Sequence, residues 1–312
     1  MRALVTGGAG FIGSHVVDGL VARGDEVIVI DDLSTGRRAN LDQALAAGAE
    51  LLEGSITDTD FCAAAFQRAE PEAVFHLAAQ IDVRVSVADP TFDLDVNVGG
   101  TARLLELSRL HKVRRFAFAS TGGAIYGEGD GRDLPLDESA ECLPDAPYGQ
   151  SKLAAEGYLS LFERMYGLDT VALRLGNVYG PRQDPHGEAG VVAIFSRALH
   201  DGIRPRVFGD GEQTRDYIYV GDVAAAFLAA TENAGAGPFN VGTGVETTVI
   251  ELGRMIGSAI GVEFDPELAP ARLGEVQRIA IDSGAARNEL GWDAATALPD
   301  GIAVTAEALR DR

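Results

Sequence analysis

The sequence predicts an α/β protein in which a doubly wound parallel sheet is followed by a smaller C-terminal α/β lobe. Three observations lead to this prediction. Short apolar runs alternate with stretches of helical periodicity over residues 2–175. The run at 73–79 is apolar throughout, which is typical of a strand buried on both faces of a parallel sheet. Beyond residue 175 the alternation becomes irregular, which indicates a second lobe.

Composition limits the classes of function. The 312 residues are 46% apolar, enough for one large or two modest domains. No run of about 18 uncharged apolar residues occurs, so we expect a soluble, cytoplasmic protein without a membrane partner. A net charge of −21 opposes binding to nucleic-acid phosphate. The only cysteines, Cys62 and Cys142, have no metal-binding spacing, so we expect free thiols and no metal.

A glycine-rich segment follows the first predicted strand, residues 3–6. Gly7, Gly10 and Gly13 allow the chain to turn, a pyrophosphate to approach the backbone, and the next helix to pack close to the sheet. That helix begins near Phe11 and its N-terminus would face the anion. A second strand follows at 27–30. This unit predicts a Rossmann-type dinucleotide site, with an ordinary αβ turn as the alternative.

The second strand ends at an acid placed to select the cofactor. Asp31 lies 18 residues after Gly13, near the spacing at which a carboxylate meets the adenosine ribose. Asp31 and Asp32 would repel a 2′-phosphate, so NAD is favoured over NADP. Arg37 and Arg38 lie just downstream and keep the NADP alternative open.

The first half continues as alternating elements. The pattern predicts a loop, a helix, a strand, a helix capped by Thr57 or Asp58, the buried strand, a long helix and another strand (33–36, 38–47, 50–53, after 58, 73–79, 90–111 and 115–119). His76 lies in the buried strand, where it could be a ligand. We favour a buried, hydrogen-bonded histidine, because no second metal-type ligand is nearby.

The strand at 115–119 leads to hydroxyl groups at the sheet edge where ligands bind, Ser120 and Thr121. After a polar loop at 128–147, Tyr148 and Lys152 lie four residues apart, on one face of a predicted helix. A nearby ammonium group favours the phenolate, so we expect the pKa of Tyr148 to fall from about 10 toward working pH. Such a phenol can act as a general base, whereas a surface pair that stabilises the helix is the alternative.

The C-terminal part is less regular. The pattern predicts a strand, a turn-rich entrance loop, a helix, two strands, a helix, a short strand and further helical segments (171–175, 176–187, 191–200, near 207–209, 216–220, 222–232, 238–242 and 247–311). We therefore expect a dinucleotide-binding domain over residues 1–175, with a return contribution from about 216–240. A substrate-binding lobe is expected over 176–312.

These motifs together resemble the extended short-chain dehydrogenase/reductase family, in its nucleotide-sugar epimerase branch. The resemblance covers essentially the whole chain and rests on the segments 7–13, 76–79, 97–101, 120–127, 148–152, 177–182 and 215–218. It implies NAD-dependent epimerisation at carbon 4 of a UDP-hexose, UDP-glucose or UDP-galactose, by a homodimer that pairs through helices at about 90–111 and 149–166. Epimerases of UDP-N-acetylhexosamines or UDP-uronates, 4,6-dehydratases and a non-catalytic NAD-binding protein are the alternatives.

The resemblance also implies the roles of individual residues. Tyr148 would be the catalytic base, Lys152 would bind the nicotinamide ribose, and Thr121 or Ser120 would supply the third hydroxyl. Ser55 replaces the aspartate that usually meets the adenine amine. The other cofactor-binding residues implied are Gly7, Gly10, Phe11, Ile12, Gly13, Asp31, Asp32, Ser34, Thr35, Gly36, Ile56, Leu77, Ala78, Ala79, Gln80 and Asn97. The substrate-binding residues implied, besides Thr121 and Tyr148, are Asn177, Val191, Val192, Arg206, Phe208, Arg215, Asn240, Arg272 and Glu275.

The resemblance distinguishes epimerase from dehydratase at two positions. Dehydratase relatives carry an Asp-Glu pair directly after the threonine, because dehydration needs an extra acid and base. Gly122 and Gly123 stand there in this chain and can transfer no proton. Glu128, Asp130 and Asp133 are expected on a solvated surface rather than at the site. Epimerisation without loss of water is therefore favoured.

Overall fold

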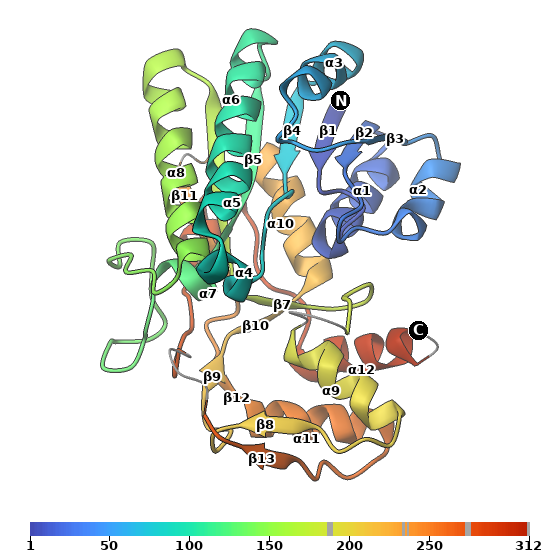
Figure 1. The fold of residues 1–312 in the computed structure, drawn as a ribbon, viewed down its shortest axis with the longest axis vertical. Coiled ribbons are helices and arrows are strands. Elements are labelled where there is room, and N and C mark those ends of the chain that lie inside the picture. The colour runs from blue at the N-terminus through green and yellow to red at the C-terminus, as the bar shows by residue number, and fades with distance from the viewer. Residues whose placement is uncertain (186–189, 233–234, 236, 272–275, 311–312) are drawn as a thin grey trace.

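The computed structural model describes residues 1–185, 190–232, 235, 237–271 and 276–310. Within these ranges the main body is a seven-stranded sheet with the strand order β11-β6-β5-β4-β1-β2-β3, and every pair is parallel (Figure 1). Its strands are β1 (Arg2–Thr6), β2 (Glu26–Asp31), β3 (Glu50–Glu53), β4 (Ala73–His76), β5 (Arg115–Thr121), β6 (Asp169–Leu175) and β11 (Gly237–Val241). This confirms the predicted fold class.

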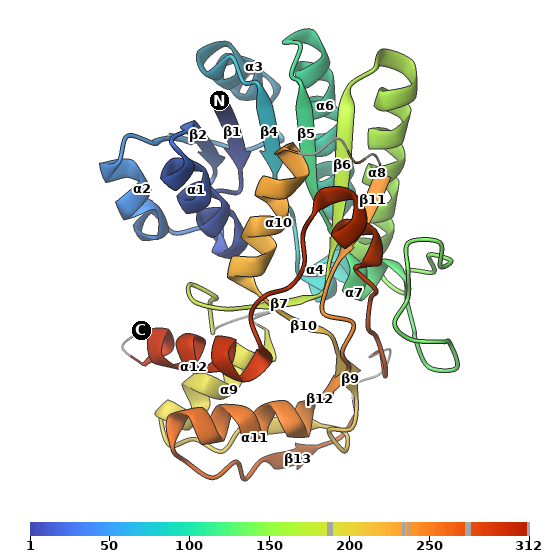
Figure 2. The same cartoon turned by 180° about the vertical axis from the view of Figure 1, so that it is seen from behind.

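Helices cover both faces of the sheet, as Figures 1 and 2 show from opposite sides, and the sheet separates two apolar cores. Side chains alternate along a strand, so Ala3 and Val5 pack into one core while Leu4 packs into the other. Helices α1 (Phe11–Arg23) and α10 (Val220–Glu232) cover the first face, and α3 (Thr59–Ala69), α6 (Gly100–Leu110) and α8 (Pro147–Tyr166) cover the second. The carboxyl ends of the strands remain between these layers, at one edge.

Helix boundaries follow from local sequence. Gly24 ends α1 with φ +90, a left-handed conformation that side chains disfavour. Asp58 accepts hydrogen bonds from the backbone N–H groups of Asp60 and Phe61 at the start of α3, which confirms one of the two predicted caps. Thr248 forms a capping box with Glu251 at the start of α11 (Val249–Ile260).

The segment expected to be one helix over 90–111 is divided. It contains α5 (Pro90–Leu94), a π-helical turn η2 (Asp95–Gly99) and α6, and an unpredicted helix α4 (Val83–Ala88) precedes it. Asp89 caps α5 by accepting from the backbone N–H of Phe92. The wider turn of η2 lets Asn97 reach across to α8, and such turns recur at functional sites.

The second lobe packs α9 (Val191–His200), α11 and α12 (Leu298–Leu309) around Tyr179, Phe195 and Ile256. The expected entrance loop at 176–187 contains a strand, β7 (Asn177–Tyr179), because its backbone pairs with β10 (Tyr217–Tyr219). No sequence pattern showed this long-range pairing. β11 pairs with β6 in the main sheet, so the chain returns to the first body before it ends.

The remaining elements are short. They are η1 (Arg38–Leu41), α2 (Asp42–Ala46), α7 (Gly122–Ile125), β8 (Arg206–Phe208), β9 (Thr214–Arg215), β12 (Thr247–Thr248), β13 (Glu267–Ala269) and η3 (Ala286–Leu290). The helix predicted at 38–47 is thus a 3-10 turn followed by a five-residue α-helix. Among the described residues, no helix is both long and apolar enough to span a bilayer.

Candidate active site

The predicted cofactor segments meet at the carboxyl edge of the sheet. Thr6, at the end of β1, is in register with Ile30 on β2 and with His76 on β4. On the other side, β4 is in register with β5, which ends at Thr121. The segments that follow these strands, 7–13, 31–36, 77–80 and 120–123, therefore leave the sheet next to one another.

The glycine segment leaves the N-terminus of α1 open. Gly7 has φ +70, and a Cβ there would lie 2.6 Å from the backbone N of Ala78. A Cβ on Gly13 would lie 2.1 Å from the carbonyl oxygen of Gly7. Gly10 caps α1 without a side-chain hydrogen bond, and the first turn has no acid. The N–H groups of Phe11, Ile12 and Gly13 therefore lack both an intrahelical acceptor and a capping side chain, an arrangement that suits an anion such as a pyrophosphate.

Asp31 closes this segment from the end of β2. It is 7% exposed, and its carboxylate accepts from the backbone N–H groups of Ala9 and Leu33, both at 2.9 Å. Burial raises the pKa of Asp31, and the two backbone bonds oppose that rise. A Cβ on Gly36 would lie 2.6 Å from Asp31 Oδ1, so this loop passes directly over the carboxylate. Asp32 is exposed and accepts from both the backbone N–H and the hydroxyl of Ser34.

Arg37, which kept the NADP alternative open, donates to Asp184 at 2.8 Å. That pair is exposed, so it is weak, but it turns the guanidinium toward another carboxylate.

Other predicted cofactor residues lie in loops at the same edge. Beyond the end of β3, the Ser55 hydroxyl shares a hydrogen bond with the Thr57 hydroxyl, and Ile56 packs against Gly100. Ser34 and Thr35 are exposed in the loop above Asp31.

Lys152 is buried, not a member of a solvated surface pair. Its side chain is 3% exposed, Nζ donates to the carbonyl oxygen of Ala119 at 3.0 Å, and the ammonium lies 4.7 Å from the ring centroid of Phe118. Burial lowers the pKa of Lys152 to about 8, while Asp93 and Glu156 oppose that fall. The surface-pair alternative is therefore excluded for this lysine.

Tyr148 lies half-buried one turn before Lys152, with Thr121 close enough to its phenol to influence the pKa. Burial raises the pKa of Tyr148 to about 12, the charge on Asp93 adds to the rise, and the Thr121 side chain opposes it. The predicted fall of the Tyr148 pKa toward working pH is therefore wrong when only the protein's own groups act on the phenol. Helical spacing predicts the nearby lysine, but neither the burial nor the carboxylate from another helix.

The structure distinguishes between the two candidate hydroxyls. Ser120 Oγ donates to Glu156 Oε1 at 2.5 Å, and Glu156 also pairs with Arg174 at 2.7 Å. Arg174 donates in turn to the hydroxyl of Tyr126 at 2.9 Å. Ser120 thus belongs to a buried network on the far side of the strand end, which leaves Thr121 beside Tyr148. Glu156 lies four residues after Lys152, and this helical spacing was the signal that could have identified it.

Two buried polar residues support the strand ends. His76 contacts the hydroxyl of Thr6 through Nδ1 at 2.7 Å and that of Thr101 through Nε2 at 2.9 Å. Burial, with a smaller contribution from Lys152, lowers the pKa of His76 to about 3. This confirms the predicted hydrogen-bonded histidine. Asn97 donates to Gln80 O at 2.9 Å and accepts from Gln80 N at 2.9 Å, which holds the segment 77–80 against η2.

Most of the predicted substrate residues that the structure describes lie beyond β5 and β6, in the second lobe; the exceptions are Thr121, Tyr148 and Asn240. Asn177 is half-buried at the start of β7, and a Cβ on Gly123 would lie 3.3 Å from its Oδ1. Arg215 is half-buried on β9 and donates to Thr214 O at 2.8 Å. Val191 and Val192 begin α9, where Val192 is 1% exposed in the lobe core. Arg272 and Glu275 fall outside the described residues.

Two expectations for this region change, those for Asn240 and Glu128. Asn240 is fully buried; its amide donates to Leu136 O and Asp282 O and accepts from the Tyr126 hydroxyl, so it is a core residue without a group left for substrate. Arg206 lies exposed at 3.2 Å from Glu267 on β13, while its neighbour Phe208 is half-buried.

Glu128 was expected on a solvated surface but accepts from the backbone N–H groups of Gln277 at 2.6 Å and Arg278 at 3.0 Å. Glu128 therefore holds the backbone of residues 277–278 in place through these two hydrogen bonds. Asp130 and Asp133 are exposed, as expected. A Cβ on Gly122 would lie 2.6 Å from Ile281 Cδ1, so a larger residue here would have to displace the Ile281 side chain.

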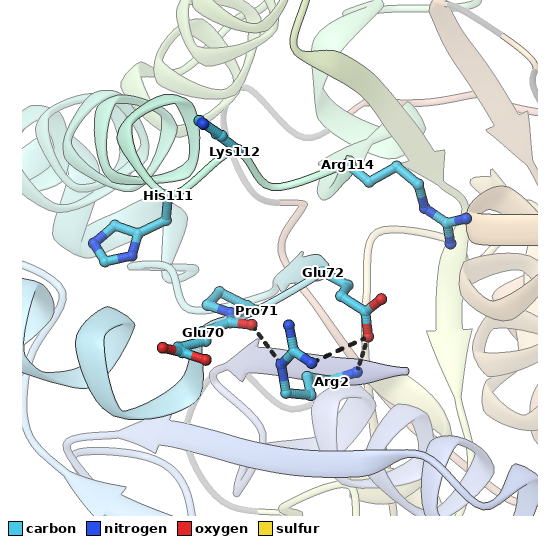
Figure 3. A pocket seen from close by; sticks show the side chains of 7 residues that line it. All are labelled: Arg2, Glu70, Pro71, Glu72, His111, Lys112 and Arg114. Atoms are coloured by element: carbon cyan, nitrogen blue, oxygen red, sulfur yellow. Dashed lines mark hydrogen bonds and ion pairs between the residues drawn. The ribbon is translucent and has the colours of Figure 1, made fainter.

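A separate cavity of about 450 Å³ lies at the opposite edge of the sheet (Figure 3). Its lining includes three cations, Arg2, Lys112 and Arg114, with Glu70 and Glu72 among them. Glu70 and His111 are the C-caps of α3 and α6, so the carbonyl ends of both helices meet there. Such ends disfavour anions, so this cavity is no candidate for a nucleotide. Across the described residues, no cluster of three or more His, Cys, Asp or Glu could hold a metal.

Comparison with known proteins agrees with this geometry. Residues 3–242 match the sequence profile of the NAD dependent epimerase/dehydratase family. UDP-glucose 4-epimerase of Mycolicibacterium smegmatis is 48% identical over all of this chain and 99% of its own length. The solved UDP-glucose 4-epimerase of Thermotoga maritima with UDP-glucose superimposes with a TM-score of 0.96, at 46% identity over 100% and 99% of the two chains. That of Thermus thermophilus in complex with NAD gives 0.92 at 43% identity, over 99% of each chain.

Proposed function

The chain belongs to the NAD-dependent epimerase/dehydratase family, and from this premise we propose that it interconverts UDP-glucose and UDP-galactose by NAD-dependent epimerisation at carbon 4. The observation that carries the proposal is the proximity of the Tyr148 phenol to Thr121, beside buried Lys152. Thr121 ends β5, and only β4 separates β5 from β1, which leads to the open N-terminus of α1. A phenol, a hydroxyl and a cation at that edge can move a proton on a sugar hydroxyl next to a nicotinamide.

NAD fits the residues at this edge. The open N–H groups of Phe11, Ile12 and Gly13 would hold the pyrophosphate, and Asp31 would accept from the adenosine ribose. Leu77–Gln80, held by Asn97, would line the path toward the nicotinamide end. When bound, NAD supplies the acceptor and donor of the hydride of carbon 4, together with a positively charged ring. We propose Lys152 as the partner of the nicotinamide ribose, since its ammonium has protons left after the bond to Ala119.

Tyr148 would take the proton from the 4-hydroxyl as the hydride leaves carbon 4, and would return a proton to the resulting 4-keto oxygen after the sugar has turned over. Thr121 would hold the same oxygen by its hydroxyl. Tyr148 must be ionised for the first step, and its pKa of about 12 in the chain alone opposes this. The Lys152 ammonium and the cationic nicotinamide both favour the phenolate, so Tyr148 becomes an effective base in the loaded enzyme.

The UDP group would lie between the two bodies. Asn177, whose Oδ1 lies near Gly123 at the end of β5, and half-buried Arg215 on β9 would hold it, and Arg272 is proposed from the sequence as a second cation. An acidic protein needs guanidinium groups to hold a diphosphate, because they bind it bidentately.

We also propose the division of the chain into two parts. The first is a dinucleotide-binding domain of residues 1–175, extended by about 216–240, and the second is a substrate-binding lobe of residues 176–312.

The dehydratase alternative is opposed by the glycines after Thr121. Neither glycine carries a side chain that could transfer a proton, and a carboxylate at position 122 would have to displace Ile281. The nearby acid Glu128 is engaged by two backbone N–H groups. No acid–base pair for dehydration is therefore present among the described residues of this segment.

The test is incubation with UDP-galactose and mass spectrometry of the product. We expect UDP-glucose of unchanged mass, whereas a product lighter by one water would replace this proposal with dehydration. Tyr148→Phe should lose most turnover and still bind UDP. Full turnover in that variant would remove Tyr148 from the mechanism.

We propose that the protein is a homodimer, and a cytoplasmic location remains a prediction. Helices α6 and α8 run side by side on one flank of the body (Figure 1). Large apolar side chains are exposed on α4, α5, α6 and α8, which are Val87, Phe92, Leu94, Leu110, Tyr158, Met165 and Tyr166. A second copy packed around a two-fold axis would cover this face. Sedimentation at the monomer mass of 32.7 kDa at micromolar concentration would contradict the dimer.

A further inference from the structure

One buried carboxylate beside the catalytic pair has no role in the steps above. Asp93 lies on α5, is 1% exposed, and was not among the residues identified from sequence. Its Oδ1 accepts from Gln80 Nε2 at 2.9 Å and from Asn97 Nδ2 at 3.1 Å. Its Oδ2 is buried and has no hydrogen-bond partner within the described part of the chain. A buried anionic oxygen without a donor is unfavourable and requires an explanation.

Lys152 is the complementary case. Three cationic side chains in the described ranges are buried, namely Arg115, Arg174 and Lys152. Arg115 pairs with Asp169 and Arg174 with Glu156. Among the described residues, no carboxylate lies within 4.0 Å of the Lys152 ammonium, which instead contacts a carbonyl oxygen and a ring. Among the described residues, Lys152 is thus the buried cation without an ion pair, and Asp93 is the buried carboxylate with an oxygen that has no hydrogen-bond partner. The two residues lie on helices that pack together, α8 and α5.

A hydrogen-bond chain fixes the carboxylate relative to α8. The Asn97 amide donates both to Asp93 Oδ1 and to Ser151 Oγ, each at 3.1 Å. Ser151 is the neighbour of Lys152, and its hydroxyl donates to the carbonyl oxygen of Tyr148 at 2.9 Å. Asp93 is therefore held in a constant position next to the turn that carries both catalytic side chains.

We propose that Asp93 is a positioning residue that acts through Lys152 and Tyr148, its buried negative charge keeping the buried Lys152 ammonium protonated. The proposal deepens the proposed epimerase function and rests on it for its catalytic consequence. Burial lowers the pKa of Lys152 to about 8, and Asp93 is the first group that opposes this fall. Without that opposition Lys152 would lose its proton near working pH and could no longer favour the phenolate.

Other charges near Lys152 do not replace Asp93. Glu156, on the same helix, is balanced by its ion pair with Arg174 at 2.7 Å. His76, on β4, is neutral because its pKa falls to about 3. Tyr148 is neutral until it acts as a base. Asp93 also raises the pKa of Tyr148, so removing its charge lowers the pKa of both members of the pair.

The chain offers a direct measurement because Lys112 and Lys152 are its only lysines. Carbon-13 labelling of lysine should give two side-chain signals in the NAD-containing protein, and Lys112, which is exposed, is an internal reference. We expect the Lys152 signal to titrate at a pH lower by about one unit in Asp93→Asn than in wild type. Asp95→Asn removes an equal charge from the exposed side of η2 and should leave the signal in place. An unshifted Lys152 titration in Asp93→Asn would overturn the proposal.

The reaction gives a second readout. In Asp93→Asn both limbs of the pH profile of kcat/KM should move to lower pH, because the pKa values of Tyr148 and Lys152 fall together. A residue that only supports packing would lower stability and leave both limbs in place, and that result would also contradict the proposal. The labelled-lysine titration does not depend on turnover, so a shift there with no epimerase activity would refute the proposed function alone.

A folding defect remains interpretable through a double variant. If Asp93→Asn does not fold because Lys152 has lost its counter-charge, Asp93→Asn/Lys152→Met should fold, since it removes both charges. Rescue in the double variant supports the pairing of the two charges. Equal failure of the single and the double variant would show that Asp93 serves packing alone and would reject the proposal.

Discussion

Replacing Lys152 by Met should change how the stability of the protein depends on pH. A lysine has an ordinary pKa of 10.5, and burial lowers the pKa of Lys152 in the fold to about 8. Between these values the unfolded chain binds a proton that the folded chain does not. The stability of the folded protein therefore rises with pH across this window. Below the window the stability is reduced, because the folded protein must hold a buried charge.

The size of this effect follows from the two pKa values. The difference between 10.5 and about 8 is about 2.5 units, and at about 1.36 kcal/mol per unit it corresponds to about 3 kcal/mol. Wild type carries this penalty in full below pH 8 and loses it as the pH approaches 10.5. The Met variant has no such titration. The free energy of unfolding of wild type should thus rise by about 3 kcal/mol relative to the variant between neutral pH and pH 10.5.

Urea unfolding at a series of pH values measures this difference, on protein refolded from urea without added NAD. Groups other than Lys152 titrate in both proteins and cancel when one free energy is subtracted from the other. Lys112→Met, which removes an exposed lysine, controls for the loss of one charge. Stability curves of wild type and Lys152→Met that stay parallel over the whole range would refute the reasoning, because a buried ammonium must show this linkage.

Three other predictions follow from the site. Gly13→Ala should destabilise the protein by about 3 kcal/mol and remove bound NAD, since its Cβ would lie 2.1 Å from Gly7 O; acid-released nucleotide and urea unfolding measure both effects. Arg215→Ala should raise the KM for the UDP-sugar far more than it changes NAD content, and unchanged UDP binding by calorimetry would contradict this. Thr121→Ala should reduce kcat on the order of 10²-fold, whereas Ser120→Ala should mainly lower stability by about 1–3 kcal/mol, because it removes a donor from Glu156. Equal losses of kcat in these two variants would show that the hydroxyls share the role.

The sequence predicts those parts of the fold that depend on local physics. Apolar runs and glycines identify β1, α1 and β2 because backbone conformation and side-chain alternation are properties of neighbouring residues. The π-turn η2 and the pairing of β7 with β10 were not predicted. Both depend on contacts with distant segments, since Asn97 reaches α8 and Asn177 lies opposite Tyr217.

The same division holds at the candidate site. Motifs identified Tyr148 and Lys152 because their helical spacing is visible in the sequence. They did not distinguish Ser120 from Thr121, since that depends on Glu156, 36 residues along the chain from Ser120. The family resemblance implied that Asn240 binds substrate, yet its side-chain amide donates to the carbonyl oxygens of Leu136 and Asp282. Polar residues in a sequence show which bonds are possible, and the fold decides which of them are made inside the protein.

The direction of the Tyr148 pKa is the clearest example of this limit. Spacing on a helix correctly indicates a cation within one turn, and a cation by itself lowers the pKa of a phenol. Burial of both side chains opposes this, because it disfavours the phenolate and the ammonium alike, and Asp93 acts on the two groups in opposite senses. It favours the charged form of Lys152 and disfavours that of Tyr148. Removing the charge of Asp93 should therefore lower the pKa values of Tyr148 and Lys152 together, although a cation near Tyr148 would by itself suggest that only the tyrosine is affected.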